Sequence, residues 1–171
     1  MSEQLHGRKP KSILSIDDIS KETILRLFNM TDRLIASDPK TYNTCLQDHG
    51  VAHLFFEPST RTLSAFHLAA GRLGAHSFVL AADHSSRQKG ESIEDTLLNM
   101  AHMGYQTLIV RLEETNILTR CLATLPDHVA LINAGEGHLH HPSQALGDAY
   151  TIQQKKNDWP HLNVAIVGDI Q

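Results

Sequence analysis

The sequence is poor in cysteine and aromatic residues, and it has no long apolar run. Two cysteines, Cys45 and Cys121, occur in 171 residues, and they lie far apart without the spacing of metal ligands. This pattern favours a reducing compartment over a disulfide-bonded scaffold. No stretch approaches the roughly 18 apolar residues of a membrane span, and residues 1–11 lack the apolar core of a signal peptide. We therefore expect a cytoplasmic protein with no membrane partner.

Clusters of positive charge are also missing. The chain has 15 basic and 19 acidic residues, which gives a formal net charge of −4, and its longest basic run is Lys155-Lys156. A nucleic-acid-binding surface needs a concentration of basic side chains, so we expect no nucleic-acid partner. The 41% of apolar and 20% of charged residues are typical of a globular protein. A length of 171 residues suffices for one complete domain and a remnant.

Segments with strand periodicity alternate with segments of helical periodicity along the chain. Strands are expected over residues 51–56, 76–81, 107–112 and 129–133, and helices over 21–36, 63–73, 93–103, 116–125 and 142–155. Strands that are separated by helices form parallel sheets, and helices then cover both faces. The sequence predicts an α/β fold with a parallel four-stranded sheet and helices on both faces.

The C-terminal residues do not fit into this domain. Residues 162–169 form a near-continuous apolar run that resembles a buried strand, yet nothing follows to cover it. We expect residues 1–150 to form one complete domain. Residues 151–171 are expected to form a linker and the first strand of a second, truncated α/β domain.

Polar residues gather where the expected strands run into helices, which is where ligands bind in open α/β sheets. Ser59, Thr60, Arg61 and Thr62 follow the first strand and start the next helix. Their hydroxyls, guanidinium and free backbone N–H groups suit an oxyanion such as phosphate. The alternative is that a hydroxyl only caps the helix while Arg61 lies in solvent.

Two further features follow the second and third strands. Residues 83–92 form a polar loop that is long for its position, which indicates either a functional segment or a solvated surface loop. Arg111 places a cation at the carboxyl end of the apolar third strand. A surface position without a ligand is the alternative for this arginine.

The fourth strand opens into a segment rich in glycine and histidine, residues 133–144. His141 precedes Pro142, a favourable first helical residue, so its ring is expected near a helix N-terminus. His138, His140 and His141 lack a fourth ligand of suitable spacing, so we expect no metal and interpret His141 as a hydrogen-bond donor. Neither a dinucleotide fingerprint nor a phosphate-binding P-loop is present, and no cofactor is expected.

Taken in order, these segments resemble the catalytic chains of aspartate carbamoyltransferases. The similarity runs from about residue 15 to the end and rests on four motifs, which are Phe55-Phe-Glu-Pro-Ser-Thr-Arg-Thr62, Lys89-Gly-Glu-Ser92 with Asp95-Thr96, Arg111, and Asn133-Ala-Gly-Glu-Gly137 with His141-Pro-Ser-Gln144. The related ornithine enzymes usually carry Arg where this chain has Lys89, and Cys where it has Ser143. Both positions, with the 133–137 run, favour the aspartate branch.

The resemblance implies transfer of the carbamoyl group from carbamoyl phosphate to the amine of L-aspartate, an early step of pyrimidine biosynthesis. Ser59, Thr60, Arg61 and Thr62 would hold the phosphate. Arg111, His141 and Thr62 would polarise the carbonyl oxygen, and Gln144 would bond the carbamoyl amide. Ser85 and Lys89 would reach into the site of a neighbouring subunit of a homotrimer. Regulatory or other pyrimidine-pathway chains are possible further partners.

Two departures from the family pattern qualify this expectation. Leu63 stands where an arginine is common, and all eight arginines lie at or before Arg120. The carboxylates of aspartate require cations that would come from a second domain, so this chain is expected to bind carbamoyl phosphate without completing the reaction. The alternatives are a truncated, non-catalytic binding or assembly module and an ornithine-type carbamoyltransferase.

Overall fold

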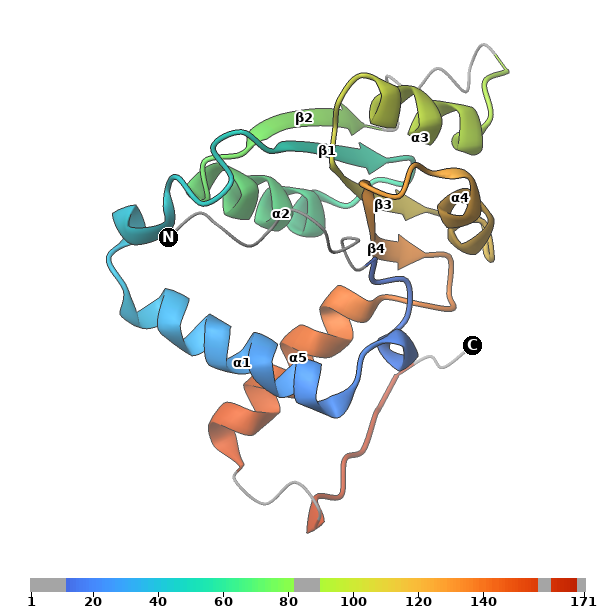
Figure 1. The fold of residues 1–171 in the computed structure, drawn as a ribbon. Coiled ribbons are helices and arrows are strands. Elements are labelled where there is room, and N and C mark those ends of the chain that lie inside the picture. The colour runs from blue at the N-terminus through green and yellow to red at the C-terminus, as the bar shows by residue number, and fades with distance from the viewer. Residues whose placement is uncertain (1–11, 82–89, 157–160, 169–171) are drawn as a thin grey trace.

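The computed structural model describes residues 12–81, 90–156 and 161–168. Four parallel strands form one sheet in the order β2-β1-β3-β4, and helices connect them (Figure 1). The strands are β1 (Gly50–Phe55), β2 (His76–Ala81), β3 (Thr107–Leu112) and β4 (Ala130–Glu136). The α-helices are α1 (Lys21–Ala36), α2 (Thr60–Arg72), α3 (Ile93–His102), α4 (Leu118–Thr124) and α5 (Pro142–Lys155), and the short 3-10 helices are η1 (Ile16–Asp18) and η2 (Pro39–Tyr42).

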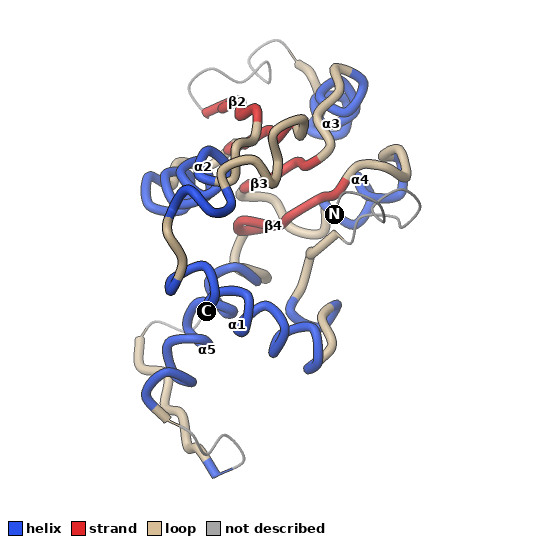
Figure 2. The backbone as a smooth tube through the Cα atoms, turned by 60° about the vertical axis from the view of Figure 1, so that its left-hand side comes forward, coloured by secondary structure: helices blue, strands red, loops and turns tan. Residues whose placement is uncertain are grey.

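Helices cover both faces of the sheet, as predicted (Figure 2). Successive residues of a strand point to opposite faces, and β1 shows this clearly. Ala52 and Leu54 join the core beneath α3 and α4, whereas Val51 and Phe55 join the core beneath α2. The central strands are therefore apolar on both sides, which explains their nearly continuous hydrophobic sequence.

Helices α1 and α5 pack against each other beside the sheet (Figure 1). The rings of Phe28 and Tyr150 lie edge to face with centroids 5.5 Å apart. The hydroxyl of Tyr150 donates to Asp32 Oδ1 over 2.7 Å, and Gln154 Nε2 donates to the same oxygen over 3.1 Å. These contacts fix α5, whose first turn belongs to the candidate site.

Helix α4 is shorter than the 116–125 helix that the sequence predicts, because a distant side chain sets its start. Glu136 Oε1 accepts the backbone N–H groups of Ile117 and Leu118 over 2.7 and 3.0 Å. Asn116, just before them, has a positive φ of 61° and does not extend the helix. Strand β4 continues to Glu136, beyond the predicted end at residue 133, and this places the carboxylate there.

Residues 162–168, where the sequence predicts a strand, show no strand pairing in the described structure. Val164, Ile166 and Val167 are 63, 79 and 94% exposed. A strand needs a neighbour to receive its backbone hydrogen bonds, and none of the described strands pairs with this segment. Of the described helices, none has both the length and the apolarity needed to cross a membrane.

Candidate functional site

The predicted site residues that the structure describes come together in one pocket of about 500 Å³. It lies at the carboxyl ends of the strands, where α2 and α5 begin. Its lining consists of Pro58, Ser59, Thr60, Arg61, Thr62, Arg111, His141 and Gln144. Ser85 and Lys89 lie outside the described residues. Side chains from three separate segments of the sequence therefore form one polar cavity.

The start of α2 presents to this pocket backbone N–H groups that have no hydrogen-bond partner within the helix. Ser59 occupies the N-cap position, but its side chain makes no capping hydrogen bond. The first backbone bond into the helix runs from Leu63 N–H to Ser59 C=O, so the N–H groups of residues 60–62 have no partner within the helix. They carry the positive end of the helix dipole. Ser59 therefore does not cap the helix with its side chain, whereas Arg61 is exposed, as the alternative expects.

Arg111 is held at the end of β3 by two contacts. Its Nη2 donates to Glu57 Oε1 over 2.9 Å, and its Nη1 donates to the Ala134 carbonyl over 3.2 Å. The Arg111 side chain is 17% exposed and that of Glu57 is 26% exposed. Nε of Arg111 is buried and has no hydrogen-bond partner among the described residues. The guanidinium is thus oriented, while several of its N–H groups remain for a ligand.

Gly135 makes room for this arrangement. It has a φ of +131°, and a Cβ at this position would overlap Nη1 of Arg111. Its neighbours in the 133–137 run support the local backbone. Asn133 donates to the Leu14 carbonyl and accepts the Gly135 N–H, each over 2.8 Å, and Glu136 caps α4. This run shapes the wall behind Arg111 and does not line the pocket.

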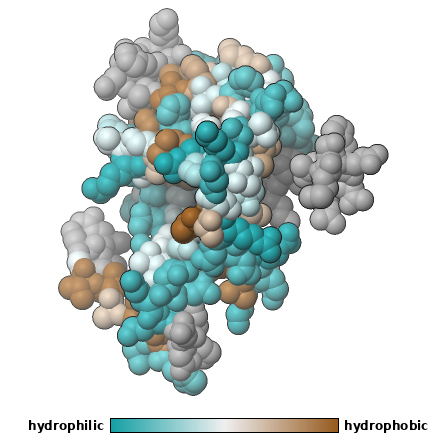
Figure 3. All heavy atoms as spheres, turned by 90° about the vertical axis from the view of Figure 1, so that its left-hand side faces the viewer, coloured by the Kyte–Doolittle hydropathy of each residue, from teal (hydrophilic) through white to brown (hydrophobic). Residues whose placement is uncertain are grey.

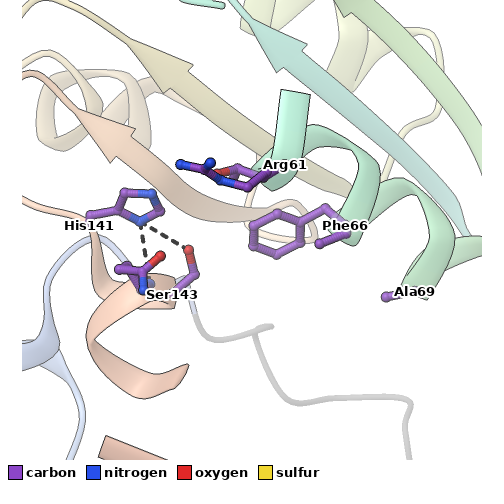
Figure 4. A pocket seen from close by; sticks show the side chains of 8 residues that line it. Arg61, Phe66, Ala69, His141 and Ser143 are labelled. Carbon is purple, nitrogen blue, oxygen red and sulfur yellow. Dashed lines mark hydrogen bonds between the residues drawn. The ribbon is translucent and has the colours of Figure 1, made fainter. Parts of the chain in front are cut away.

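His141 is the N-cap of α5, and its hydrogen bonds define its tautomer. Nδ1 accepts the Gln144 N–H over 3.4 Å and lies 3.2 Å from the Ser143 hydroxyl (Figure 4). Burial, and next the positive charge of Arg111, lower the pKa of His141. A neutral ring that accepts at Nδ1 carries its proton on Nε2. Figure 4 shows that the ring edge opposite these bonds is turned toward Arg61.

The site continues along α2 into an adjoining pocket of about 450 Å³. Arg61, Thr62, His141 and Gln144 line both spaces, and the second space adds Ala65, Phe66, Ala69 and Ser143. Figure 4 shows Phe66 and Ala69 on α2 on one side and His141 and Ser143 at the start of α5 on the other. The face of the molecule in Figure 3 shows hydrophobic residues scattered among predominantly hydrophilic ones. Because Ala65, Phe66 and Ala69 line the second space, the polar anion site opens into a less polar extension.

Sequence reasoning does not reveal the role of Glu57. This residue belongs to one of the family motifs, but the sequence does not predict its pairing with Arg111. The sequence does contain a signal for this ion pair, since an acidic residue follows β1 and a basic residue ends β3. The pairing requires that β1 and β3 be neighbours, which the structure shows and the order of elements alone does not. Within the described ranges, no three His, Cys, Asp or Glu side chains are grouped as metal ligands.

Comparison with known proteins identifies the family of this chain. Residues 11–154 match the family described as "Aspartate/ornithine carbamoyltransferase, carbamoyl-P binding domain". The chain belongs to this family. It is 39% identical over 160 residues to the aspartate carbamoyltransferase catalytic subunit of Ehrlichia chaffeensis, covering 94% of this chain and 53% of that protein. It is 41% identical over 164 residues to that of Xylella fastidiosa, covering 94% and 51%.

Solved structures of this carbamoyltransferase family share the fold. The Trypanosoma cruzi aspartate transcarbamoylase in complex with carbamoyl phosphate and aspartate superposes with a TM-score of 0.76 at 31% identity, covering 88% of this chain and 46% of that one. Its complex with carbamoyl aspartate and phosphate gives a TM-score of 0.79 at 30% identity over the same shares. The predicted fold class and family are confirmed. The chain spans about half the length of the relatives it matches.

Proposed function

We propose that this chain is the carbamoyl-phosphate-binding part of an aspartate carbamoyltransferase. The complete reaction transfers the carbamoyl group of carbamoyl phosphate to the amine of L-aspartate and yields N-carbamoyl-L-aspartate and phosphate, early in pyrimidine biosynthesis. One observation carries the proposal. Side chains from β3 and from the starts of α2 and α5 converge on a pocket built for an anion, and they are the residues that the family motifs contain.

The phosphate binds at the start of α2. The free N–H groups of residues 60–62 and the hydroxyls of Ser59, Thr60 and Thr62 surround the phosphate oxygens, and Arg61 supplies charge-assisted hydrogen bonds. The helix dipole favours the same negative charge. This set of donors does not require a metal ion.

The carbamoyl group lies toward Arg111 and α5. The amine of aspartate attacks the carbonyl carbon, negative charge develops on the carbonyl oxygen, and the bond from carbon to the phosphate oxygen breaks as phosphate leaves. Arg111, Nε2–H of His141 and the Thr62 hydroxyl stabilise the developing oxyanion. A neutral His141 that donates through Nε2 serves this role without taking a proton. Gln144 bonds the carbamoyl amide.

The remaining parts of the proposal concern the assembly. Residues 1–150 act as the carbamoyl-phosphate domain, and residues 151–171 lead into a domain that binds the amino acid. Three chains form a homotrimer in which Ser85 and Lys89 of one subunit complete the site of the next. The enzyme works in the cytoplasm, alone or with other pyrimidine-pathway chains. The sequence motifs around Lys89 support the shared site.

Calorimetry of the 171-residue chain tests the function. We expect binding of carbamoyl phosphate and of inorganic phosphate, and none of aspartate. Replacing Arg61 by Ala removes charge-assisted contacts and should weaken phosphate binding roughly 10- to 150-fold, whereas Arg33→Ala on the exposed face of α1 should leave it unchanged. Heat from aspartate comparable to that from carbamoyl phosphate, or less than a twofold effect of Arg61→Ala, would contradict the proposal.

A further inference from the structure

The side-chain amide of Gln144 has a defined orientation in this pocket. Its Nε2 donates to Asp148 Oδ1 over 2.9 Å. A carboxylate can only accept hydrogen bonds, so the nitrogen end of the amide must face Asp148. The oxygen end, Oε1, has no hydrogen-bond partner within the described part of the chain and is the end left for a ligand.

The pair lies on a helix that the rest of the domain holds in place. Gln144 and Asp148 are four residues apart on α5, so their side chains are neighbours on one helix face. Pro142 at the helix start is buried, and Asp32 of α1 binds both Tyr150 and Gln154 further along the helix. The helix is therefore held in place before any ligand arrives, and the exposed bond to Asp148 orients the amide on it.

Gln144 and His141 together present a matched pair of hydrogen-bonding groups. His141 offers a donor, Nε2–H, because its Nδ1 accepts from the Gln144 backbone. Gln144 offers an acceptor, Oε1, because its Nε2 is engaged by Asp148. A carbamoyl group has the complementary arrangement, with an accepting carbonyl oxygen and a donating NH₂. An acetyl group has the same carbonyl but a methyl group in place of NH₂.

We propose that Asp148 is a positioning residue that turns the Gln144 carbonyl oxygen toward the ligand and so selects carbamoyl over acetyl compounds. This inference rests on the function proposed above and extends it to a residue outside the four motifs on which the resemblance rests. Without Asp148 the amide can rotate by half a turn, since such a terminal torsion has two nearly equivalent positions. Its NH₂ would then meet the NH₂ of the ligand, and the preference would fall.

Two phosphonates that differ in one group provide the test. Phosphonoacetamide ends in a carboxamide and acetonylphosphonate in a methyl ketone, and neither has a scissile bond to phosphorus. The ratio of their dissociation constants, measured by calorimetry with the 171-residue chain, reports the contribution of the NH₂ group. A hydrogen bond contributes about two- to tenfold in affinity, so we expect the wild-type chain to prefer the amide by that factor.

A double-mutant cycle separates positioning from simple charge. Asp148→Ala should lower the ratio about twofold, because the ligand must then select one of two nearly equivalent positions of the amide. Gln144→Leu removes the acceptor and should bring the ratio close to one, and adding Asp148→Ala to Gln144→Leu should change the ratio no further. Loss of the negative charge at residue 148 strengthens binding of both phosphonates and of inorganic phosphate alike, so it leaves the ratio unaffected. Glu22→Gln on α1, a charge change outside the pocket, is the matched control and should keep the wild-type ratio.

The outcomes distinguish this inference from the proposed function. A wild-type chain that binds inorganic phosphate and both phosphonates equally would overturn the selectivity while leaving the phosphate site intact. A preference that Asp148→Ala leaves undiminished, or a change in the ratio that persists in the Gln144→Leu background, would overturn the positioning role of Asp148. A wild-type chain that binds none of the three anions would overturn both proposals.

Discussion

His53 makes the stability of this domain sensitive to acid. Its side chain is completely buried on β1. Nε2 lies 2.8 Å from the Ser77 hydroxyl, which also lies 3.0 Å from Nδ1 of His67, and Nδ1 of His53 has no partner among the described residues. Burial, and next the nearby His67, lower the pKa of His53 from 6.5 to about 4. The folded protein therefore holds this ring neutral.

The sign and the size of the effect follow from linkage. Between about pH 6.5 and pH 4 the unfolded chain binds a proton at His53 that the folded chain does not, so the free energy of unfolding decreases as the pH falls through this range. The loss amounts to about 3 kcal/mol at pH 4 and levels off below that pH, where the folded chain binds the same proton. That is a large part of the 5–15 kcal/mol that typically stabilises a domain. Burial also lowers the pKa values of His49 and His141, so these residues likewise decrease the free energy of unfolding as the pH falls.

Urea unfolding at pH 7.5, 5.5 and 4.5 measures this dependence. His53→Gln, which keeps a group able to bond Ser77, should lose less stability between pH 7.5 and 4.5 than the wild-type chain, by about 2 to 3 kcal/mol. His67→Gln is the control. It removes the second cause of the pKa shift but not the burial, so most of the acid sensitivity should remain. If His53→Gln folds at pH 7.5 and shows the full wild-type loss on acidification, the argument from burial is wrong.

Two further substitutions test the wall behind Arg111 and the start of α4. Gly135→Ala places a Cβ against Nη1 of Arg111 at a φ of +131°, so we expect about 1–3 kcal/mol of destabilisation and at least tenfold weaker phosphate binding by calorimetry. Gly71→Ala, with open space around its Cβ, is the control and should cause neither effect. Glu136→Ala leaves two N–H groups without an acceptor and should cost about 1–3 kcal/mol in urea unfolding. Glu136→Gln retains an acceptor oxygen, and an equal loss in both Glu136 variants would refute the capping role.

Local sequence signals predict most of the elements well. Helix α1 has the bounds that the sequence predicts, because Ser20 caps it and apolar residues recur at helical spacing, and Ser20 does accept the Thr23 N–H. Helix α5 follows in the same way from Pro142 at its first position. Both signals act within a few residues, so no knowledge of tertiary structure is needed.

The features that sequence reasoning misses depend on contacts between distant residues. The start of α4 depends on Glu136, which is 18 residues away from Leu118. The orientation of Arg111 depends on Glu57, 54 residues away. The segment 162–168 has the composition of a strand but no neighbour to pair with in the described structure. Composition and periodicity indicate a preferred local conformation, but they do not identify the distant residues that will form hydrogen bonds with it.

The acidic residues beside the pocket show how this site balances charge against orientation. Glu57 and Asp148 each lie next to a site proposed for a dianion, where a negative charge lowers affinity. Each is nevertheless hydrogen-bonded to a group that lines the pocket, Glu57 to Arg111 and Asp148 to Gln144. A long side chain loses considerable rotamer freedom when it is ordered. These hydrogen bonds hold the Arg111 and Gln144 side chains in place, so that loss occurs before a ligand binds. Under the proposed function, Asp148 orients Gln144 toward the NH₂ group of the bound substrate. Glu57 holds Arg111 at the carbonyl oxygen, where charge develops, so that pair benefits the transition state more than the bound substrate.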